Sequence, residues 1–283
     1  MTGAIDILCN LFTEESIKKN WYGQEEFRRL IEWWHMEDRV QGIDIEAFIA
    51  LMDEANVVQV MIPAIRMMAE QKNRMIWDIT EEEVYAVVQK HPDRFVGLAG
   101  FNPYTRLEGV RQVERAVKEW GFKGVYLHTY GFGIPLNHRL YYPLYAKCAE
   151  LGIPVSMQVG HSAELMPSEL GRPIALDDIA LDFPELSIIG AHTGWPWTEE
   201  MIALAWKHPN VYMGIDAHAP QYLEPSVVSF MKTRGKTKVL YGTNFPAVLH
   251  KESVNYLREH MGIKEATADL ILHDNAARVY GLA

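Results

Sequence analysis

The stretch Asp182-Phe-Pro-Glu-Leu-Ser-Ile-Ile-Gly-Ala-His-Thr-Gly-Trp195 carries the pattern that decides the fold. Pro184 ends the helical periodicity before it, because proline cannot continue a helix. The apolar run 186–190 has the length of a buried strand, and the polar residue His192 follows it closely. The same order of helix end, apolar strand and polar residue recurs along the chain, which is typical of a parallel sheet wrapped by helices.

Apolar runs of strand length predict eight strands, at 4–9, 57–62, 95–99, 124–128, 154–158, 186–190, 211–215 and 238–241. Amphipathic stretches between them predict helices, among them 43–54, 81–89, 107–120, 140–151, 198–207 and 252–260. This alternation predicts an α/β fold of the (β/α)8 or TIM-barrel type. The chain of 283 residues has no linker-like segment, and single barrels of about 250 residues are common. We therefore expect one domain over residues 1–283.

The segment 11–42 is an insert, because it is far longer than the few residues that usually follow a barrel strand. It contains many aromatic side chains, among them Trp21, Phe27, Trp33 and Trp34. Long segments after barrel strands lie at the C-terminal face, where barrel enzymes build their sites. Two interpretations fit equally well. The insert forms a lid or substrate-facing wall, or it is a helix that packs its tryptophans on the barrel or on a second subunit.

The charge balance argues against a nucleic-acid partner. The net charge is −10, with 27 Lys and Arg against 37 Asp and Glu, and the longest basic run is the short segment 232–238. Phosphate binding relies on clustered basic side chains, which this sequence lacks. Two cysteines, Cys9 and Cys148, cannot form a disulfide framework. The sequence has neither a secretion-signal pattern nor a long apolar span, so we expect a cytoplasmic protein without a membrane segment.

Polar residues at the predicted C-terminal ends of the strands are candidates for a site, because these ends converge in a barrel. They include Asn10, Arg66, His128, Gln158, His161, His192, Asp216, His218 and Asn244. A single histidine in such a place is more often a hydrogen-bonded structural residue. Several histidines at one end of a barrel favour catalysis instead.

The loop 160–173 follows the predicted fifth strand and adds further polar groups. Its Arg172 suits a carboxylate clamp, although pairing with Glu164 or Glu169 to hold the loop explains it equally well. Trp195, close after the sixth strand, suits an aromatic wall for a planar substrate. Core packing is the alternative explanation for a tryptophan at that point.

Several short motifs, in their order and spacing, resemble those of one protein family. They are Gly121-Phe-Lys-Gly-Val-Tyr-Leu-His128, Tyr142-Pro-Leu-Tyr145, Gly152-Ile-Pro-Val155, the opening stretch 182–195, His208-Pro-Asn-Val-Tyr212, Val239-Leu-Tyr-Gly-Thr-Asn-Phe-Pro246 and Asp274-Asn-Ala-Ala-Arg278. The chain from Ile5 to Leu282 thus resembles the amidohydrolase-related proteins, the branch of the amidohydrolase superfamily that contains aminocarboxymuconate-semialdehyde decarboxylase, γ-resorcylate decarboxylase and 2-pyrone-4,6-dicarboxylate lactonase. The resemblance implies a barrel enzyme that forms a homodimer or a higher homo-oligomer.

The resemblance also implies a set of metal ligands, most of which this sequence replaces. The family's Ile-Asp-x-His-x-His run is present without its histidines, whose positions hold Leu8 and Asn10. The fifth-strand histidine falls on Gln158, the sixth-strand histidine is kept as His192, and the eighth-strand aspartate is Asn244. Leucine cannot bind a metal, and amides are weak neutral donors. We therefore expect no metal cofactor. The alternative is Zn or Mn at relocated ligands chosen from His128, His161, Asp216 and His218.

The function we expect is metal-independent hydrolysis of a lactone or ester in a small carboxylated, ring-derived acid, with hydration or decarboxylation as runner-up. The resemblance includes a lactonase that needs no metal. In this hypothesis His192 or His161 activates water or moves a proton, and Asp216 orients it or acts as the base. Gln158 and Asn244 bind the polarised carbonyl or carboxylate, unless they merely bond one another. The other expected substrate-binding residues are Asn10, Arg66, His128, Arg172, Trp195 and His218.

Two alternatives stay open. A pseudoenzyme that lost its metal would survive as a binding subunit, which the replaced ligands favour and the retained polar cluster opposes. A metal-dependent hydrolase with relocated ligands is the other. In the enzymatic interpretations the partner is a small-molecule carboxylate substrate.

Overall fold

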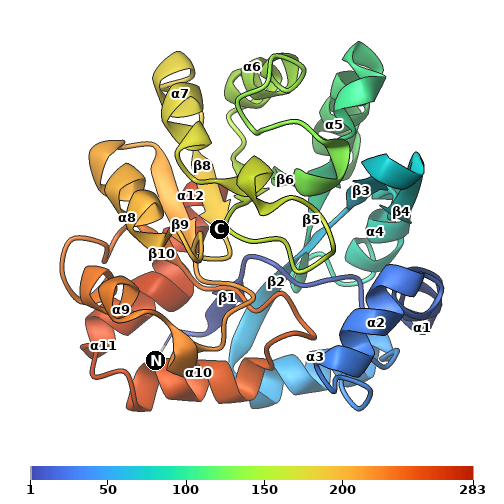
Figure 1. Ribbon diagram of the computed structural model, residues 1–283. Coiled ribbons are helices and arrows are strands. Elements are labelled where there is room, and N and C mark those ends of the chain that lie inside the picture. The colour runs from blue at the N-terminus through green and yellow to red at the C-terminus, as the bar shows by residue number, and fades with distance from the viewer. Residues whose placement is uncertain (1, 283) are drawn as a thin grey trace.

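The computed structural model describes residues 2–282. Within that range the main sheet has eight parallel strands in this spatial order: β1 (Ala4–Asp6), β2 (Val57–Pro63), β5 (Phe95–Gly100), β6 (Gly124–Leu127), β7 (Val155–Gln158), β8 (Ile188–Ala191), β9 (Val211–Gly214) and β10 (Val239–Leu240). The sheet closes on itself where Ile7 N donates to the Tyr241 carbonyl at 3.1 Å. Figure 1 shows the strands in the middle of the molecule with helices around them. The predicted (β/α)8 barrel is therefore confirmed.

Helices cover the outside of the barrel. They are α3 (Ile45–Glu54), α4 (Glu81–Val88), α5 (Leu107–Trp120), α6 (Tyr142–Leu151), α7 (Ala175–Asp182), α8 (Thr198–Lys207), α9 (Pro225–Lys232) and α10 (His250–Glu259), followed by α11 (Glu265–Asp269) and α12 (Asn275–Tyr280). Local sequence explains their ends: Thr80 and Glu83 form a capping box on α4, and Gly121 ends α5 at φ 71°. Among residues 2–282, none of the helices is long and apolar enough to cross a membrane.

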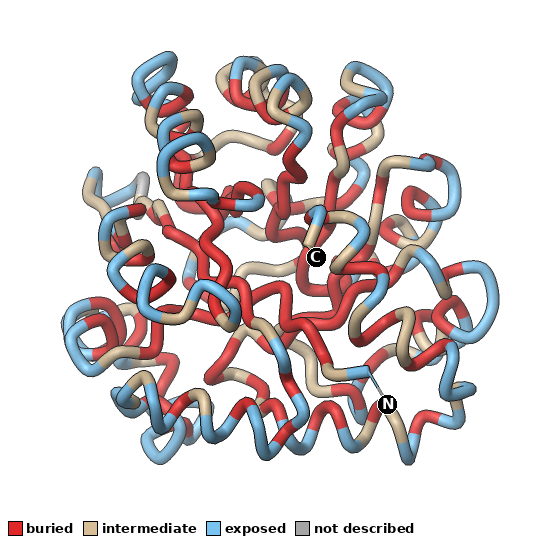
Figure 2. Tube along the Cα trace, turned by 180° about the vertical axis from the view of Figure 1, so that it is seen from behind, coloured by how far each residue is buried: buried red, intermediate tan, exposed pale blue. Residues whose placement is uncertain are grey.

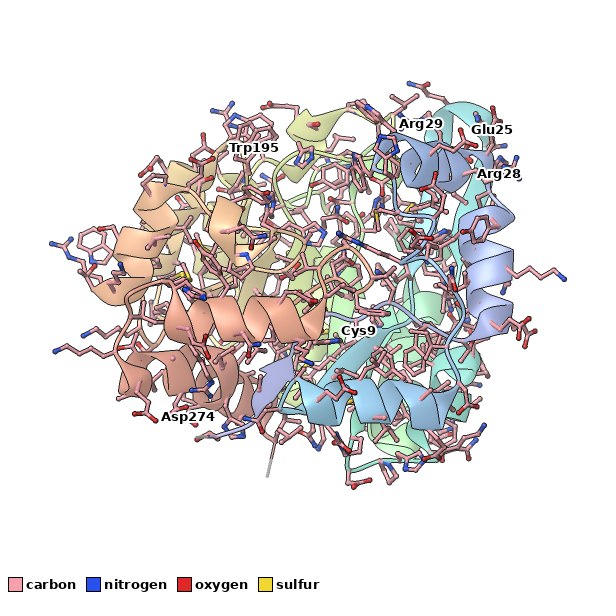
Figure 3. The ribbon with its side chains drawn as sticks, turned by 90° about the horizontal axis from the view of Figure 1, so that it is seen from below. Cys9, Glu25, Arg28, Arg29, Trp195 and Asp274 are labelled. Carbon is pink, nitrogen blue, oxygen red and sulfur yellow. The ribbon has the colours of Figure 1, made fainter. Side chains whose placement is uncertain are left out.

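The core fills the barrel and the layer between strands and helices. Strands β5, β6 and β7 are buried along their whole length, and Figure 2 shows the buried trace inside and exposed segments outside. Cys9 lies near the middle of the molecule, whereas Glu25 and Arg28 lie at its edge (Figure 3). The predicted strand 4–9 is shorter in the structure and ends at Asp6; Cys9 then forms a separate bridge to Phe245.

A buried carboxylate ties the first strand to the last. Asp6 is fully buried, and its Oδ1 accepts hydrogen bonds from Leu8 N and Thr243 N, both at 2.9 Å. Its Oδ2 accepts from Thr243 Oγ1 and faces His250 Nε2 at 2.8 Å. Because a buried carboxylate is costly unless it is hydrogen-bonded, this cluster fixes the seam of the barrel.

The insert folds into α1 (Glu14–Ser16), a π-helical turn (Ile17–Tyr22) and α2 (Glu25–Trp33). It packs on a hairpin that the sequence did not predict, formed by the antiparallel strands β3 (Arg66–Ala69) and β4 (Arg74–Asp78). Phe27 stacks on Trp77 with ring centroids 4.2 Å apart, and Trp77 Nε1 donates to the Asn20 carbonyl at 2.7 Å. Trp21 and Phe27 therefore anchor the insert to this hairpin, whereas Trp33 and Trp34 are exposed.

Candidate active site

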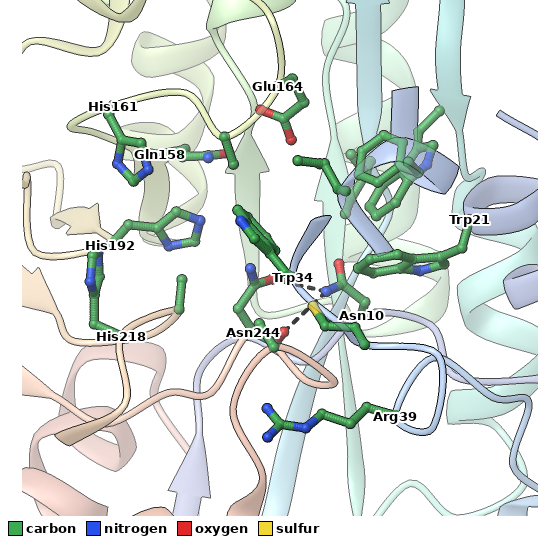
Figure 4. Close-up of a pocket in the computed structure, with 18 of the residues that line it drawn as sticks. Asn10, Trp21, Trp34, Arg39, Gln158, His161, Glu164, His192, His218 and Asn244 are labelled. Atoms are coloured by element: carbon green, nitrogen blue, oxygen red, sulfur yellow. Dashed lines mark hydrogen bonds between the residues drawn. The ribbon is translucent and has the colours of Figure 1, made fainter. Parts of the chain in front are cut away.

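A cavity of about 330 Å³ opens where the C-terminal ends of the strands meet the insert. Its polar lining comes from the strand ends, namely Asn10, Gln158, His161, His192, His218 and Asn244. Aromatic residues also line it, including Trp21, Phe27, Trp34 and Trp77. Figure 4 shows the three histidines on one side of the cavity and Trp21 on the other. The insert therefore faces the cavity, as a substrate-facing wall would. It also packs on the rest of the chain, as the other interpretation requires.

His192 and Asp216 form a hydrogen-bonded pair beside this cavity. His192 Nδ1 contacts Asp216 Oδ2, and the Asp216 carboxylate is fully buried. Two glycines leave room for that carboxylate: a Cβ at Gly214 would lie 2.4 Å from Asp216 Oδ1, and a Cβ at Gly242 would lie 2.7 Å from Asp216 Cβ. Since Nδ1 is engaged and the ring lines the cavity, Nε2 is the nitrogen that remains for a ligand.

Two amide groups present N–H donors to the cavity. Asn10 Nδ2 donates to Asn244 Oδ1 at 2.9 Å and to the Phe245 carbonyl at 2.8 Å, which leaves the Asn244 amino group for a ligand. Gln158 Oε1 accepts from the Tyr126 hydroxyl at 3.2 Å, which leaves the Gln158 amino group. Asn244 and Gln158 therefore accept hydrogen bonds from Asn10 and Tyr126, and these contacts orient the two amide groups. Paired donors of this kind suit a developing oxyanion.

Four backbone positions after the C-terminal ends of β8, β9 and β10 adopt the left-handed region without being glycine. They are His192 at φ 66°, Thr193 at φ 58°, Ala217 at φ 66° and Asn244 at φ 52°. Such conformations cost roughly 1–3 kcal/mol each outside glycine and cluster at functional sites. His192, Ala217 and Asn244 line the cavity, so part of the strained backbone lies where the polar groups converge.

His161 and His218 flank His192 and favour their neutral forms. Burial, followed by the nearby His192, lowers the pKa of His218 to about 4. Burial and then His192 also lower the pKa of His161. The two rings lie 6.4 Å apart between centroids. Neutral imidazoles at these positions add hydrogen-bonding capacity to the cavity without adding charge.

We expect His218 to make the protein less stable as the pH falls from about 6.5 toward about 4. The pKa of His218 is lower in the folded protein than in the unfolded chain. Between these two values the unfolded chain binds a proton that the folded protein does not, so the free energy of unfolding decreases as the pH falls. The full effect is on the order of 2–3 kcal/mol. Urea unfolding at several pH values measures it, and His218→Asn should flatten the curve. An unchanged pH slope in that variant would contradict the assignment.

Glu164 lines the cavity and carries a charge. Burial raises the pKa of its carboxyl, but the nearby His128 imidazole, a backbone hydrogen bond and a hydrogen bond from Ser162 outweigh this, and the pKa falls to about 2. His128 Nε2 lies 3.6 Å from Glu164 Oε2, and Ser162 Oγ donates to the same oxygen at 2.8 Å. At the 3.6 Å separation the histidine contact is chiefly electrostatic.

The structure brings together most, but not all, of the residues predicted for the site. His128 packs behind Glu164, away from the cavity lining. Arg66 Nη2 binds Glu81 Oε2 at 2.6 Å, and Arg172 Nη2 binds Glu200 Oε1 at 2.8 Å, so neither guanidinium lines the cavity. Trp195 is 41% exposed and lies outside it as well.

Several lining residues were not predicted, and they come mainly from the insert. Arg39 is the main one, because among the lysines and arginines of residues 2–282 it alone lines the cavity. Figure 4 places Arg39 and Glu164 on opposite sides of the cavity. Trp34 and Tyr126 are two further lining residues that were not predicted. The length and aromatic content of the insert signalled its role, but no pattern distinguished Arg39 from the other basic residues there.

The donor set does not fit a divalent metal ion. The amides of Asn10, Gln158 and Asn244 are weak neutral donors, whereas such ions prefer carboxylates, thiolates or imidazoles. The imidazoles of His161, His192 and His218 also line the cavity, but they are not arranged as a metal-binding group. The Asp216 carboxylate is already engaged by His192 Nδ1. Among the described side chains of residues 2–282, which leave out Glu70, no group of three or more His, Cys, Asp or Glu is arranged to hold a metal ion.

Comparison with known proteins supports the fold and identifies the family. An uncharacterised TIM-barrel protein of Bordetella bronchiseptica has a TM-score of 0.80 and 24% identity, with 99% of this chain and 98% of that chain covered. The 2,6-dihydroxybenzoate decarboxylase of Rhizobium has a TM-score of 0.73 and 15% identity, with 100% and 99% covered. A 5-carboxyvanillate decarboxylase of Novosphingobium aromaticivorans, complexed with manganese and 4-hydroxy-3-methoxy-5-nitrobenzoic acid, has a TM-score of 0.72 and 17% identity, with 99% and 96% covered. The amidohydrolase family profile matches residues 29–282. The chain therefore belongs to the amidohydrolase family.

Proposed function

We propose that this chain is an enzyme that hydrolyses an ester bond in a small, carboxylated and ring-derived acid without a metal ion. The observation that carries the proposal is the His192–Asp216 pair, whose Nε2 faces a cavity supplied with two amide donors. The aromatic lining of the cavity suits a planar substrate. The strained backbone at His192 and Asn244 supports a working site over a vacated one.

In the proposed mechanism His192 acts as the base. The Asp216 carboxylate accepts a hydrogen bond from Nδ1–H of His192, which fixes the tautomer with an unprotonated Nε2. Nε2 takes a proton from water, and the water oxygen bonds to the ester carbonyl carbon. Asn244 and Gln158 donate hydrogen bonds to the carbonyl oxygen as it becomes negative. The carbon–oxygen bond to the leaving group then breaks, and the imidazolium returns its proton to the leaving oxygen.

Arg39 is the proposed anchor for the carboxylate of the substrate. It lines the cavity, while Arg66 and Arg172 are bound to Glu81 and Glu200. Glu164 is ionised at the opposite side and repels an anion there. The two fixed charges thus orient an acid with its carboxylate toward Arg39.

Arg39→Gln should raise KM for a carboxylated substrate by about 10- to 100-fold, because one charge-assisted hydrogen bond is lost. The value of kcat should change little, since Arg39 does not touch the reacting bond in this mechanism. Steady-state kinetics separates the two parameters. Arg111→Gln, on the exposed face of α5, is the matched control. A loss of kcat at unchanged KM would remove Arg39 from the anchoring role.

Screening lactones and esters of aromatic acids, with turnover in ¹⁸O-labelled water, tests the proposal. Hydrolysis predicts one labelled oxygen in the acid product. Turnover that releases CO₂ and leaves the ester bond intact would replace hydrolysis with decarboxylation. Ligand binding without turnover across the panel would favour the pseudoenzyme alternative.

Decarboxylation is the second candidate, favoured by the structural similarity to the Rhizobium and Novosphingobium decarboxylases. The same imidazole would serve as an acid. The carbon–carbon electron pair would move onto the ring carbon as CO₂ leaves, and protonated His192 would supply the proton that this carbon takes up. Release of CO₂ from 2,6-dihydroxybenzoate, measured in metal-free buffer, tests it.

A further inference from the structure

A second pocket of about 280 Å³ adjoins the active-site cavity. It is lined by Thr193, Trp195, Tyr222, Leu223 and Glu224, together with His161 and His218. These two histidines also line the inner cavity, so they form the partition between the two spaces. We call the second space the outer pocket.

The partition stands beside the proposed base. Thr193, the residue after His192, lines the outer pocket, whereas His192 lines the inner cavity. The His161 ring packs edge-on against Trp195 with centroids 4.9 Å apart, which joins the partition to the wall of the outer pocket. His161 and His218 are both partly exposed. The outer pocket therefore begins next to the proposed base, on the far side of these two histidines.

The two spaces differ in charge. Arg39 lines the inner cavity, and Glu224 lines the outer pocket. Within residues 2–282 neither lysine nor arginine lines the outer pocket. Tyr222, which is 77% exposed, and Trp195 supply aromatic faces there. Aromatic faces beside a carboxylate favour a neutral or cationic planar group and disfavour an anion.

We propose that the substrate spans both spaces, with a carboxylated acyl half in the inner cavity and a neutral or cationic aromatic leaving group in the outer pocket. The inference rests on the proposed ester hydrolysis and narrows it to open-chain esters, because a lactone has no separate leaving group. In the hydrolytic step water supplies OH to the acyl carbon and H to the leaving oxygen, so the products are a dicarboxylic acid and a free alcohol.

Monoesters of terephthalic acid, each with one carboxylate and one ester, test this prediction. The leaving alcohols are methanol, benzyl alcohol, 4-(trimethylammonio)benzyl alcohol and 4-carboxybenzyl alcohol. We expect kcat/KM to rise about 10-fold from the methyl to the benzyl ester, to stay high for the cationic ester and to fall for the anionic one. Equal rates for the methyl and benzyl esters would overturn the inference.

Two variants locate the effect in the outer pocket. Tyr222→Ala, at an exposed position, should remove most of the benzyl preference. Glu224→Lys should reverse the order of the cationic and anionic esters. Glu185→Lys changes an exposed glutamate that lies before β8, outside both spaces, and should leave the order unchanged. Unchanged ester preferences in both outer-pocket variants would also overturn the inference.

A binding experiment separates this inference from the proposed chemistry. The monobenzylamide of terephthalic acid resists hydrolysis, and quenching of tryptophan fluorescence reports its binding because Trp21, Trp34 and Trp77 line the inner cavity. We expect the monobenzylamide to bind about 10-fold more tightly than the monomethylamide, and Tyr222→Ala to weaken its binding. This result supports occupation of both spaces even if no ester is hydrolysed. Equal affinity for the two amides would contradict occupation of both spaces even if esters are hydrolysed.

Discussion

His192→Ala is expected to lower kcat by about 10²- to 10⁴-fold, because proton transfer by a positioned side chain contributes a factor of that size. KM should change little, since the aromatic lining of the cavity and Arg39 supply most of the substrate contacts. Asp216→Asn should also reduce kcat, because an amide no longer fixes the tautomer that leaves Nε2 unprotonated. Steady-state kinetics on a hydrolysed ester measures both effects.

The control for this prediction is His260→Ala, which removes an exposed imidazole near the end of α10. It should retain full activity. The shape of the pH profile gives a second readout, because loss of the base should remove the acidic limb of the kcat profile in the weakened enzyme. Full turnover by His192→Ala would refute the role assigned to this residue.

The second large effect concerns stability. Asp6→Ala is expected to reduce the free energy of unfolding by about 3–5 kcal/mol, since it leaves several buried donors without their carboxylate. Thr243 and His250 lose the group that joins the end of β10 and the start of α10 to β1. Urea unfolding followed by circular dichroism measures the change.

Asp93→Ala, at an exposed carboxylate before β5, is the matched control and should lie within about 0.5 kcal/mol of the parent protein. Asp6→Asn should fall between the two, because an amide keeps part of the hydrogen bonding. If Asp6→Ala were as stable as the control, the barrel seam would not depend on this carboxylate.

The barrel was predictable because buried parallel strands are continuous apolar runs, which 95–99 and 211–215 illustrate. The site was partly predictable for a related reason. Polar residues at the ends of parallel strands converge whatever the loops do, so His192, Asp216 and Asn244 met as expected.

Ion pairs between residues far apart in the sequence could not be predicted. Arg66 and Arg172 were expected to bind substrate, but their partners Glu81 and Glu200 lie 15 and 28 residues further along the chain. No local pattern reveals such distant pairs, although the alternative partner given for Arg172 is confirmed, since its Nη1 also lies 3.3 Å from Glu169 Oε1. The hairpin β3–β4 was missed because its methionines and arginines do not alternate as in a half-buried strand. Arg39 was missed because it stands in irregular backbone after α2.

The central claim is that this chain performs its chemistry with His192, Asp216 and two amides, without a metal ion. The most direct test measures ester turnover before and after treatment with a chelator, with the metal content of the same samples determined by plasma mass spectrometry. The account predicts substoichiometric metal and equal turnover in both samples. A stoichiometric manganese or zinc ion, whose removal abolishes turnover and whose return restores it, would contradict the account.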